Sequence, residues 1–375
     1  MIKRRENNEK TADDRPVLYH GSLFIRRMQR FRSVSRASGF KRHAGRAGRV
    51  CGRGPAASAA PADGTVLALK AAHVVSEESS THKTLVRLGE EIEKVSGGKM
   101  TVEVYGNSVM GTAREIVESM QAGALDMAIL ANAPYSGFTD ALTCFDVPYL
   151  FDSLDEGWYV LDDPFGTEIL SDLENQGLHC LGWVGASWRN MSTTKVEAHS
   201  PADMKGLKMR VIESPMHVEH FNLIGCSATP MAFSELYTAL QQGVVDGQDN
   251  HWLEMWTSAL HEVQGYLMET RHIMDPTNIM MSKTTYDNLT DEQRGWVDEA
   301  FESAKADMRQ ITTDDELTNK QNVIDAGHCK VIELTEAERD SFKAAAQPMI
   351  DKYTESNPNV KKIITLTEEF RAQNS

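Results

Sequence analysis

The stretch "ELYTALQQGVVD" (Glu235 to Asp246) repeats a stretch that lies 120 residues earlier, "EIVESMQAGALD" (Glu115 to Asp126). The two align without a gap and share their first glutamate, a Gln-x-Gly and their last aspartate. The offset is longer than the ~20–50-residue unit of a solenoid. We therefore interpret the pair as two copies of one α/β unit, each in its own lobe. The alternative is chance similarity between two amphipathic helices with glycine caps.

Helices and strands alternate around the first copy. "TVLALKAAHV", from Thr65, reads as a strand, and the helical run after it places four aliphatic residues on one face: Leu85, Leu88, Ile92 and Val95. Thr112 and Glu115 match a capping box at the start of the next helix, which gives way to a strand from Met127 to Leu130. This alternation predicts an α/β fold with a largely parallel sheet.

A second stretch, "GLKMRVIESP" (Gly206 to Pro215), alternates as a strand with one buried face, and Lys208 and Arg210 project from the other face. Two similar lobes suit ligand capture by hinge closure, and ligands of such sheets lie beyond the carboxyl ends of the strands. The end of this strand is such a place, and so is "DGQDN" (Asp246 to Asn250). Arg210, and Arg189 in "GASWRNMST", could each hold a carboxylate with two parallel hydrogen bonds. The alternative is that both are surface residues.

Charge is unevenly distributed along the 375 residues. Residues 1–60 contain fifteen Lys/Arg and four Asp/Glu, a net charge of +11, whereas the remainder contains 24 basic and 50 acidic residues, a net charge of −26. A basic tail can signal nucleic-acid binding, but a targeting or incorrectly translated segment explains it more simply, and we expect no nucleic-acid partner. No stretch approaches the ~18 consecutive apolar residues of a transmembrane helix.

The basic segment ends in two candidate cleavage sites. Ala57-Ser58-Ala59 and Ala60-Pro61-Ala62 fit the small-x-small rule for secretion. The apolar region of about 7–15 residues that a signal peptide carries before such a site is not recognisable. We expect a secreted protein whose start, or reading frame upstream of the cleavage site, is incorrect. Residues 1–64 are therefore excluded from the fold as a targeting or mis-assigned segment.

Signatures of catalysis and cofactor binding are absent from the sequence. There is no Gly-x-Gly-x-x-Gly, phosphate loop, His-Glu-x-x-His or Gly-x-Ser-x-Gly, so we expect neither an enzyme nor a cofactor. His217 and His220 would share a helical face, as metal ligands can, but we expect that face to be solvated and without a metal.

The four cysteines after residue 64 form no Cys-x-x-Cys. We expect buried free thiols, with one structural disulfide as the alternative.

Residues 67–340 resemble the solute-binding proteins of tripartite ATP-independent periplasmic (TRAP) transporters. The segments that carry the resemblance are "DMKGLKMRVIESP", "GCSATPMAFSELYTALQQGVVDGQDN", "FDVPYLFDS" and "HEVQGYLMETRHI". The resemblance implies a periplasmic receptor, expected to be a monomer, that binds a small organic acid and delivers it to the small and large membrane subunits of the transporter. The rival classes are an enzyme that acts on a similar acid and a sensor subunit with the same fold.

The family fold has two α/β lobes, joined by crossing strands and a long helix, that close on the ligand. By the resemblance, lobe one comprises residues 66–186 and 276–315. Lobe two comprises residues 187–275 and 316–375.

The resemblance also implies the binding residues. Arg210 would form a salt bridge with the substrate carboxylate, and Arg189 would also reach the ligand. Four further pocket residues are implied: Asn250, which joins the arginines, Phe233, which forms a wall, and Glu213 and His73, which could hydrogen-bond hydroxyl groups.

The sequence departs from the branch of the family that binds sialic acid. Ala113 and Ala131 stand where that branch has acidic groups, so sialic acid is not expected. A second ligand carboxylate near Glu213 would meet like-charge repulsion, whereas a hydroxyl group could donate a hydrogen bond to it. We therefore expect a hydroxylated monocarboxylate, such as a uronic or aldonic acid, with a C4-dicarboxylate as the alternative.

Overall fold

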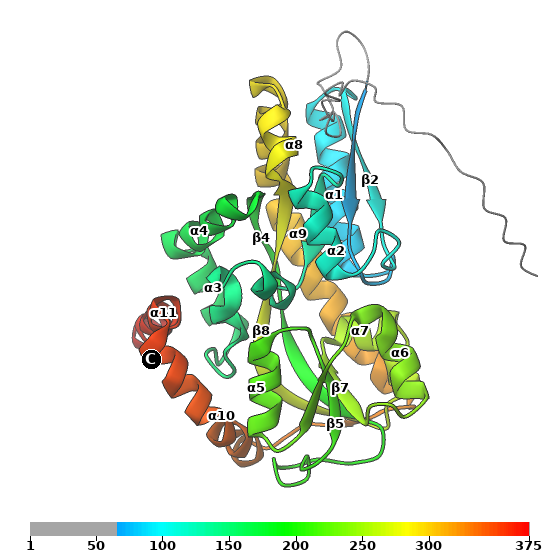
Figure 1. Cartoon of the computed structure of the whole chain (residues 1–375), viewed down its shortest axis with the longest axis vertical. Coiled ribbons are helices and arrows are strands. Elements are labelled where there is room, and N and C mark those ends of the chain that lie inside the picture. Colours follow the sequence, from blue (N-terminus) through cyan, green and yellow to red (C-terminus); the bar gives the residue numbers. More distant parts are fainter. Residues whose placement is uncertain (1–65, 375) are drawn as a thin grey trace, which may run out of the picture. The chain divides into compact units, whose positions relative to one another are not determined.

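A computed structural model describes residues 66–374, and these residues form a single mixed sheet covered by helices (Figure 1). The strand order is β2-β1-β3-β8-β4-β7-β5-β6, and β9 pairs with β8. The strands are β1 (Leu67–Ala72), β2 (Met100–Tyr105), β3 (Met127–Leu130), β4 (Leu178–Thr193), β5 (Lys208–Val211), β6 (Ser227–Pro230), β7 (Gly247–Asn250), β8 (Tyr266–Ser282) and β9 (Lys330–Ile332).

The outer strands of the sheet are parallel, and its centre is antiparallel. β1 pairs in parallel with β2 and β3, and β5 pairs in parallel with β6 and β7. Between these groups, the long strands β4 and β8 run antiparallel to each other through the middle of the fold (Figure 1). The prediction of a largely parallel sheet is therefore right for each lobe and wrong for the two strands that join the lobes. An α/β fold of two lobes with crossing strands is confirmed.

Helices cover both halves of the sheet. The α-helices are α1 (Ser80–Val95), α2 (Ala113–Gln121), α3 (Leu154–Asp162), α4 (Pro164–Ser171), α5 (Pro215–Leu223), α6 (Phe233–Gln241), α7 (Trp252–Thr257), α8 (Lys283–Asn288), α9 (Asp291–Ala326), α10 (Glu336–Ser356) and α11 (Pro358–Asn374). Short 3-10 helices are η1 (Ala133–Gly137), η2 (Ala141–Asp146), η3 (Asp172–Gln176) and η4 (Leu260–Glu262). The longest helix, α9, packs against α1, β4 and α7 and so contacts both halves.

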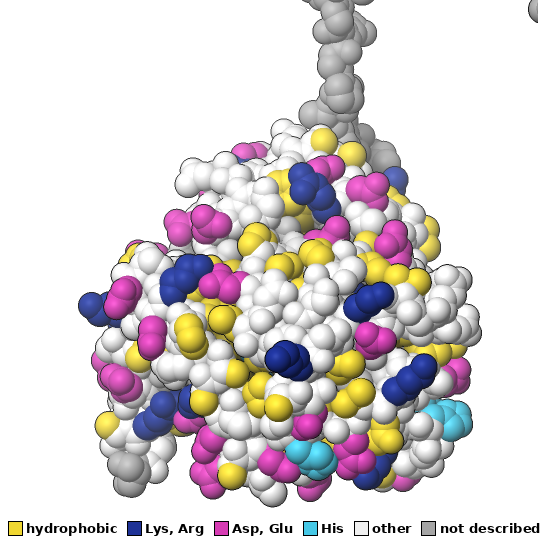
Figure 2. Space-filling view, turned by 60° about the horizontal axis from the view of Figure 1, so that its bottom comes forward, with side chains coloured by type: hydrophobic (Ala, Val, Ile, Leu, Met, Phe, Trp, Pro, Cys, Tyr) yellow, Lys and Arg dark blue, Asp and Glu magenta, His cyan; other side chains and the backbone are white. Residues whose placement is uncertain are grey.

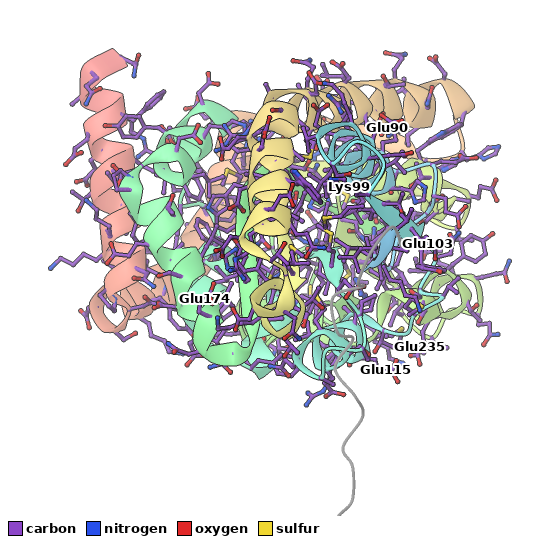
Figure 3. All side chains as sticks on the ribbon, turned by 90° about the horizontal axis from the view of Figure 1, so that it is seen from above. Glu90, Lys99, Glu103, Glu115, Glu174 and Glu235 are labelled. Atoms are coloured by element: carbon purple, nitrogen blue, oxygen red, sulfur yellow. The ribbon has the colours of Figure 1, made fainter. Side chains whose placement is uncertain are left out.

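The internal repeat corresponds to two copies of the same local structure. Glu115 lies in the first turn of α2 and Glu235 in the first turn of α6, and both are labelled in Figure 3. Each helix is followed by a glycine in the left-handed region, Gly123 (φ 69°) and Gly243 (φ 68°). Side chains other than glycine disfavour this conformation, which explains why both copies carry glycine here.

The last residue of each repeat bonds a preceding strand in the same way. The Asp126 carboxylate accepts a hydrogen bond from the backbone N–H of Lys70, at 2.8 Å. The Asp246 carboxylate accepts one from the backbone N–H of Lys208, at 2.9 Å. Because Lys70 and Lys208 belong to the corresponding strands β1 and β5, the repeat is a duplicated α/β unit, as interpreted, and not a chance similarity.

The apolar faces predicted from the sequence are buried. Leu85, Leu88 and Ile92 of α1 pack with residues of α9, including Phe301. Thr112 and Glu115 form the predicted capping box. In the second half, α5 and α10 enclose a separate core under β5. The core between α1 and α9 and the core under β5 are separate, as a hinged pair of lobes requires.

The C-terminal segment contacts both halves. α10 packs against α5, and α11 packs against α3, where Arg371 forms an ion pair with Glu156 at 2.7 Å. The lobe boundaries given above remain a prediction.

Further expectations from the sequence concern the N-terminal segment, membrane-spanning helices and the cysteines. The basic segment 1–64 and its cleavage sites lie outside the described residues. Within residues 66–374, no helix is long and apolar enough to cross a membrane. The four described cysteines are free thiols, three buried and one half-buried, as expected: Cys144, Cys226, Cys329 and Cys180. On the face that Figure 2 brings forward, basic and acidic side chains are interspersed.

Candidate functional site

One cavity within the described residues lies where the carboxyl ends of strands from both halves meet. Its empty space is about 1070 Å³, including the part open to solvent. Residues one or two positions after the ends of five strands line it: Val74, Ala131, Ile212, Met231 and His251. This is the position expected for a ligand of such sheets. Because both halves contribute walls, a bound molecule would hold them together.

Helix N-termini face this cavity, and that of α6 has no side-chain cap. Ser79 caps α1 and Thr112 caps α2 with their hydroxyl groups. The N-cap of α6 is Ala232, which has no side chain that could accept such a bond. Ala232 and Phe233 both line the cavity. The first N–H groups of α6, at the positive end of the helix dipole, are therefore suited to an anion.

Arg210 is a buried cation without a carboxylate bonded to it. It is 2% exposed and lines the cavity. Its Nε donates to the Met231 carbonyl oxygen at 3.0 Å, and its Nη1 has no hydrogen-bond partner among residues 66–374. Burial and the nearby charge of Arg189 lower the pKa of Arg210 to about 10. The strand arginine therefore faces a cleft and is ready for an anion.

Arg189 is also buried at the cavity, but the protein already neutralises it. Its Nε donates to the Asp249 carboxylate, its Nη2 to the Asp249 carbonyl oxygen at 2.6 Å, and its Nη1 to the Asp275 carboxylate at 3.1 Å. Burial opposes the charge of Arg189, but the two carboxylates outweigh burial and raise its pKa. The direct ligand contact implied by the resemblance remains a prediction. The contacts of Arg189 are those of a residue that holds the cavity wall.

A buried histidine cluster continues from Asp249. His272 Nε2 lies 3.3 Å from Asp249 Oδ2, and His220 stacks on His272 with ring centroids 5.3 Å apart. His217 Nε2 lies 3.5 Å from a carboxylate oxygen of Asp146. His217 and His220 are 1% and 0% exposed, so the expectation of a solvated helix face is wrong. The helix packs this face against β8 and η2, where it completes the interior of the second half.

A second charged cluster lies beside the cavity. His251 Nδ1 is 3.0 Å from Glu254, and its Nε2 is 3.4 Å from Asp275. Burial lowers the pKa of His251, but the two carboxylates outweigh burial and raise this pKa to about 10. Burial also raises the pKa of Glu316, on α9, to about 7. The positive charge of His251 is thus matched within the protein.

The structure brings together most of the residues that the sequence implied. Asn250 is 4% exposed, lines the cavity, and its amide nitrogen has no partner among the described residues. Phe233 and Glu213 also line the cavity, as do Ala113 and Ala131.

His73 is not among the residues that line the cavity, and its implied role in binding remains a prediction. Its Nε2 lies 3.0 Å from His82 Nδ1, and its ring packs against Gly106, where an added Cβ would come within 2.9 Å of it. Burial and His82 lower the pKa of His73 to about 4, so the ring is neutral. It supports the loop behind the cavity.

Sequence reasoning missed the carboxylates and histidines around the arginines. Asp249 was noted only as part of "DGQDN", and no motif indicated the others: Glu254, His251, His272, Asp275 and Glu316. One signal was available, because Asp275 interrupts an apolar strand and a charge buried in a strand needs a partner.

Comparison with known proteins identifies the family. Residues 71–357 match the family described as bacterial extracellular solute-binding protein, family 7. The chain belongs to this family. A solute-binding protein of Verminephrobacter eiseniae is 36% identical over 60% of this chain and 68% of its own length. The C4-dicarboxylate-binding periplasmic protein of Rhodobacter capsulatus is 30% identical over 79% of this chain and 89% of its own.

A solved structure has the same fold. It is the sugar acid binding protein of Advenella mimigardefordensis in complex with galactonate, with a TM-score of 0.78 and 26% identity over 82% of this chain and 99% of that chain. Family 7 proteins are extracytoplasmic receptors that bind small organic acids and work with the membrane subunits of TRAP transporters. The chain is therefore a receptor and not an enzyme.

Proposed function

We propose that this protein is a periplasmic receptor for a hydroxylated monocarboxylate, such as a uronic or aldonic acid, and that it delivers this acid as a monomer to a TRAP transporter. The observation that carries the proposal is the unpaired guanidinium of Arg210 in the cavity. A guanidinium beside the uncapped N-terminus of α6 offers two kinds of donor to one carboxylate group.

The distribution of positive charge supports a single ligand carboxylate. Arg189 is matched by Asp249 and Asp275, and His251 by Glu254 and Asp275. Among the described residues of the cavity wall, Arg210 is then the cation that lacks a bonded carboxylate. A second carboxylate in the cavity would be desolvated without a partner, which is costly.

The polar side chains of the wall suit hydroxyl groups. Glu213 can accept a hydrogen bond, and the free amide N–H of Asn250 can donate one. On the opposite wall, the cavity is lined by Thr81, Thr84 and Ser108. Phe233 adds an apolar surface for the carbon chain. Galactonate, the ligand of the similar structure, is an acid of this class.

The alternative is a C4-dicarboxylate, which the name of the Rhodobacter capsulatus relative states for that protein. A thermal-shift screen separates the two. We expect galactonate, glucuronate or a related sugar acid to stabilise the protein by about 2.7 kcal/mol at a hundred times its dissociation constant. Succinate and malate should leave the melting temperature unchanged. A screen in which dicarboxylates alone stabilise the protein would overturn the ligand class but not the receptor assignment.

The N-terminus of α6 gives a separate test of where the carboxylate binds. Replacing Ala232 by aspartate would place a carboxylate at the N-cap, where it would bond the free N–H groups itself. We expect this variant to bind the acid at least about tenfold more weakly, a loss of ~1.4 kcal/mol, and the ligand-free protein to be about 0.5–2 kcal/mol more stable.

The matched control is Ala232→Asn, which caps the helix without a charge. Calorimetry should find its affinity between those of the wild type and Ala232→Asp, because it competes for the N–H groups but does not repel the ligand. Wild-type affinity in the aspartate variant would remove the α6 N-terminus from the site.

A further inference from the structure

A second group of ligand-type side chains lies away from the cavity, on the second half of the fold. His261 and Glu262 belong to η4, which follows α7. His328 directly follows Gly327, the C-cap of α9. One nitrogen or oxygen atom from each of the three residues lies within 4.8 Å of the other two. Segments that are more than 60 residues apart in the sequence therefore bring two imidazoles and one carboxylate together.

His261 is held in one orientation and one tautomer. Its Nδ1 donates to the Met255 carbonyl oxygen at 2.9 Å, which leaves Nε2 with a free lone pair. The ring is 6% exposed and stacks on Trp256, with centroids 4.8 Å apart. A hydrogen bond from the other ring nitrogen to a carbonyl group is the usual support of a metal-binding histidine.

The other two side chains are free to move onto an ion. Glu262 and His328 are exposed, and within residues 66–374 the carboxylate of Glu262 makes no hydrogen bond or ion pair. The His328 ring stacks near His261, with centroids 5.8 Å apart. Ligand atoms around a tetrahedral zinc ion are about 3.3 Å apart, since Zn–N and Zn–O bonds measure about 2.0–2.2 Å. A rotation of the His328 ring and an inward movement of about 1–2 Å would meet this geometry.

Positive charge near the site is already neutralised. Lys330, two residues after His328, pairs with Glu197 at 2.8 Å. The carboxylate of Glu262 is therefore the charged group that faces the two rings, and a divalent cation would compensate it.

We propose that His261, Glu262 and His328 form a site for a transition-metal dication of the zinc, nickel and copper class. Two imidazoles favour these metals over Mg²⁺ and Ca²⁺, which prefer oxygen ligands. Water would complete the coordination. The ion would tie the C-terminal end of α9 to the segment after α7, and α7 contains the cavity residues Leu253 and Glu254. It would act as a structural clamp of the second half of the fold.

Calorimetric titration of the full chain with Zn²⁺, without organic acid and without a histidine tag, tests the site. We expect His328→Ala and Glu262→Gln each to weaken the tightest Zn²⁺ binding at least tenfold. Both residues are exposed, so these variants should fold, whereas His261→Ala would also remove a stacked, buried ring. Titration with Co²⁺ should give a visible absorption band in the wild type that the two variants lose.

The matched control is His199→Ala. His199 is exposed and also lies beside two carboxylates, those of Glu338 at 2.7 Å and Glu197 at 3.2 Å. We expect this variant to bind Zn²⁺ like the wild type. The site is refuted if the wild type binds no Zn²⁺, if His328→Ala binds it unchanged, or if His199→Ala loses as much. Affinity for the organic acid should be the same in all three variants, which separates this test from that of the receptor function.

Discussion

Replacing Arg210 by alanine is expected to weaken binding of the organic acid at least about a hundredfold. The ligand carboxylate would lose its charged partner inside a desolvated cavity, and removal of one partner of a buried pair costs ~3–5 kcal/mol. Each ~1.4 kcal/mol corresponds to a factor of ten in the dissociation constant. Isothermal calorimetry with the best sugar acid from the screen measures this loss directly.

Arg210→Lys should also bind weakly. The Nε of Arg210 is bonded to the Met231 carbonyl oxygen while Nη1 is left for the ligand. An ammonium group is a compact point charge that cannot make both contacts in this geometry. Wild-type affinity in the alanine or the lysine variant would remove Arg210 from the site.

Removing the charge of Arg210 weakens ligand binding, but it should not reduce the stability of the ligand-free protein. Burial moves the pKa of Arg210 from its ordinary value of 12.5 to about 10. This displacement means that keeping the charge costs about 3 kcal/mol of folding free energy at neutral pH. Arg210→Met keeps most of the side-chain volume and removes the charge. We therefore expect the methionine variant to be at least as stable as the wild type without ligand, although it binds the acid weakly.

The fold could be predicted from the sequence where the local residue pattern determines the local structure. The duplicated unit could be read from twelve aligned residues because its shared glycine and aspartate each have one local task. The Gly123 and Gly243 positions need a left-handed backbone, and Asp126 and Asp246 each bond the backbone of a neighbouring strand. The antiparallel centre was not predictable in this way, because the pairing of β4 with β8 depends on residues about 70–100 positions apart.

The site was predictable only in part, for a physical reason. A buried cation can be inferred from one strand, and Arg210 lies where its strand pattern and the family resemblance placed it. Whether a buried charge is free or neutralised depends on its neighbours in space. The carboxylates that pair with Arg189 come from β7 and β8, at positions 249 and 275. No local spacing relates them to Arg189, so the two arginines looked equivalent in the sequence and differ in the structure.

The burial of His217 and His220 could not be predicted from the sequence for a related reason. His217 and His220 are three residues apart on a short helix whose outer face cannot be known until α10 and β8 are in place. His73 was assigned to the cavity by the family resemblance. Its ring instead turns toward His82. A backbone position can be predicted from alignment, but the direction of the side chain depends on packing.

Replacing Arg189 by methionine is expected to destabilise the ligand-free protein by about 3–5 kcal/mol. Asp249 and Asp275 are 0% and 4% exposed, and both bond the Arg189 guanidinium. Without Arg189, two buried carboxylates remain with only histidines beside them. Urea denaturation of Arg189→Met and Arg210→Met measures the contrast, because the two variants remove the same group from neighbouring positions of one cavity. Equal stability of the two variants would contradict the assignment of Arg189 to the cavity wall.

The pH dependence of stability gives this contrast a second readout. Burial raises the pKa of Asp249, but Arg189 outweighs burial and holds this pKa well below its ordinary value of 3.8. A carboxylate with a lowered pKa contributes stability above about pH 4, and this contribution is lost as the pH falls through the folded-state value. Without Arg189, the pKa of Asp249 should rise, and protonation would relieve the unpaired charge.

We therefore expect the difference in unfolding free energy between Arg189→Met and the wild type to be largest near neutral pH and to shrink toward pH 3. The difference between Arg210→Met and the wild type should stay constant over the same range, because the Arg210 guanidinium remains charged throughout. If lowering the pH changed the unfolding free energy of both variants, relative to the wild type, by the same amount, the ion pairs of Arg189 would not be what stabilises the cavity wall.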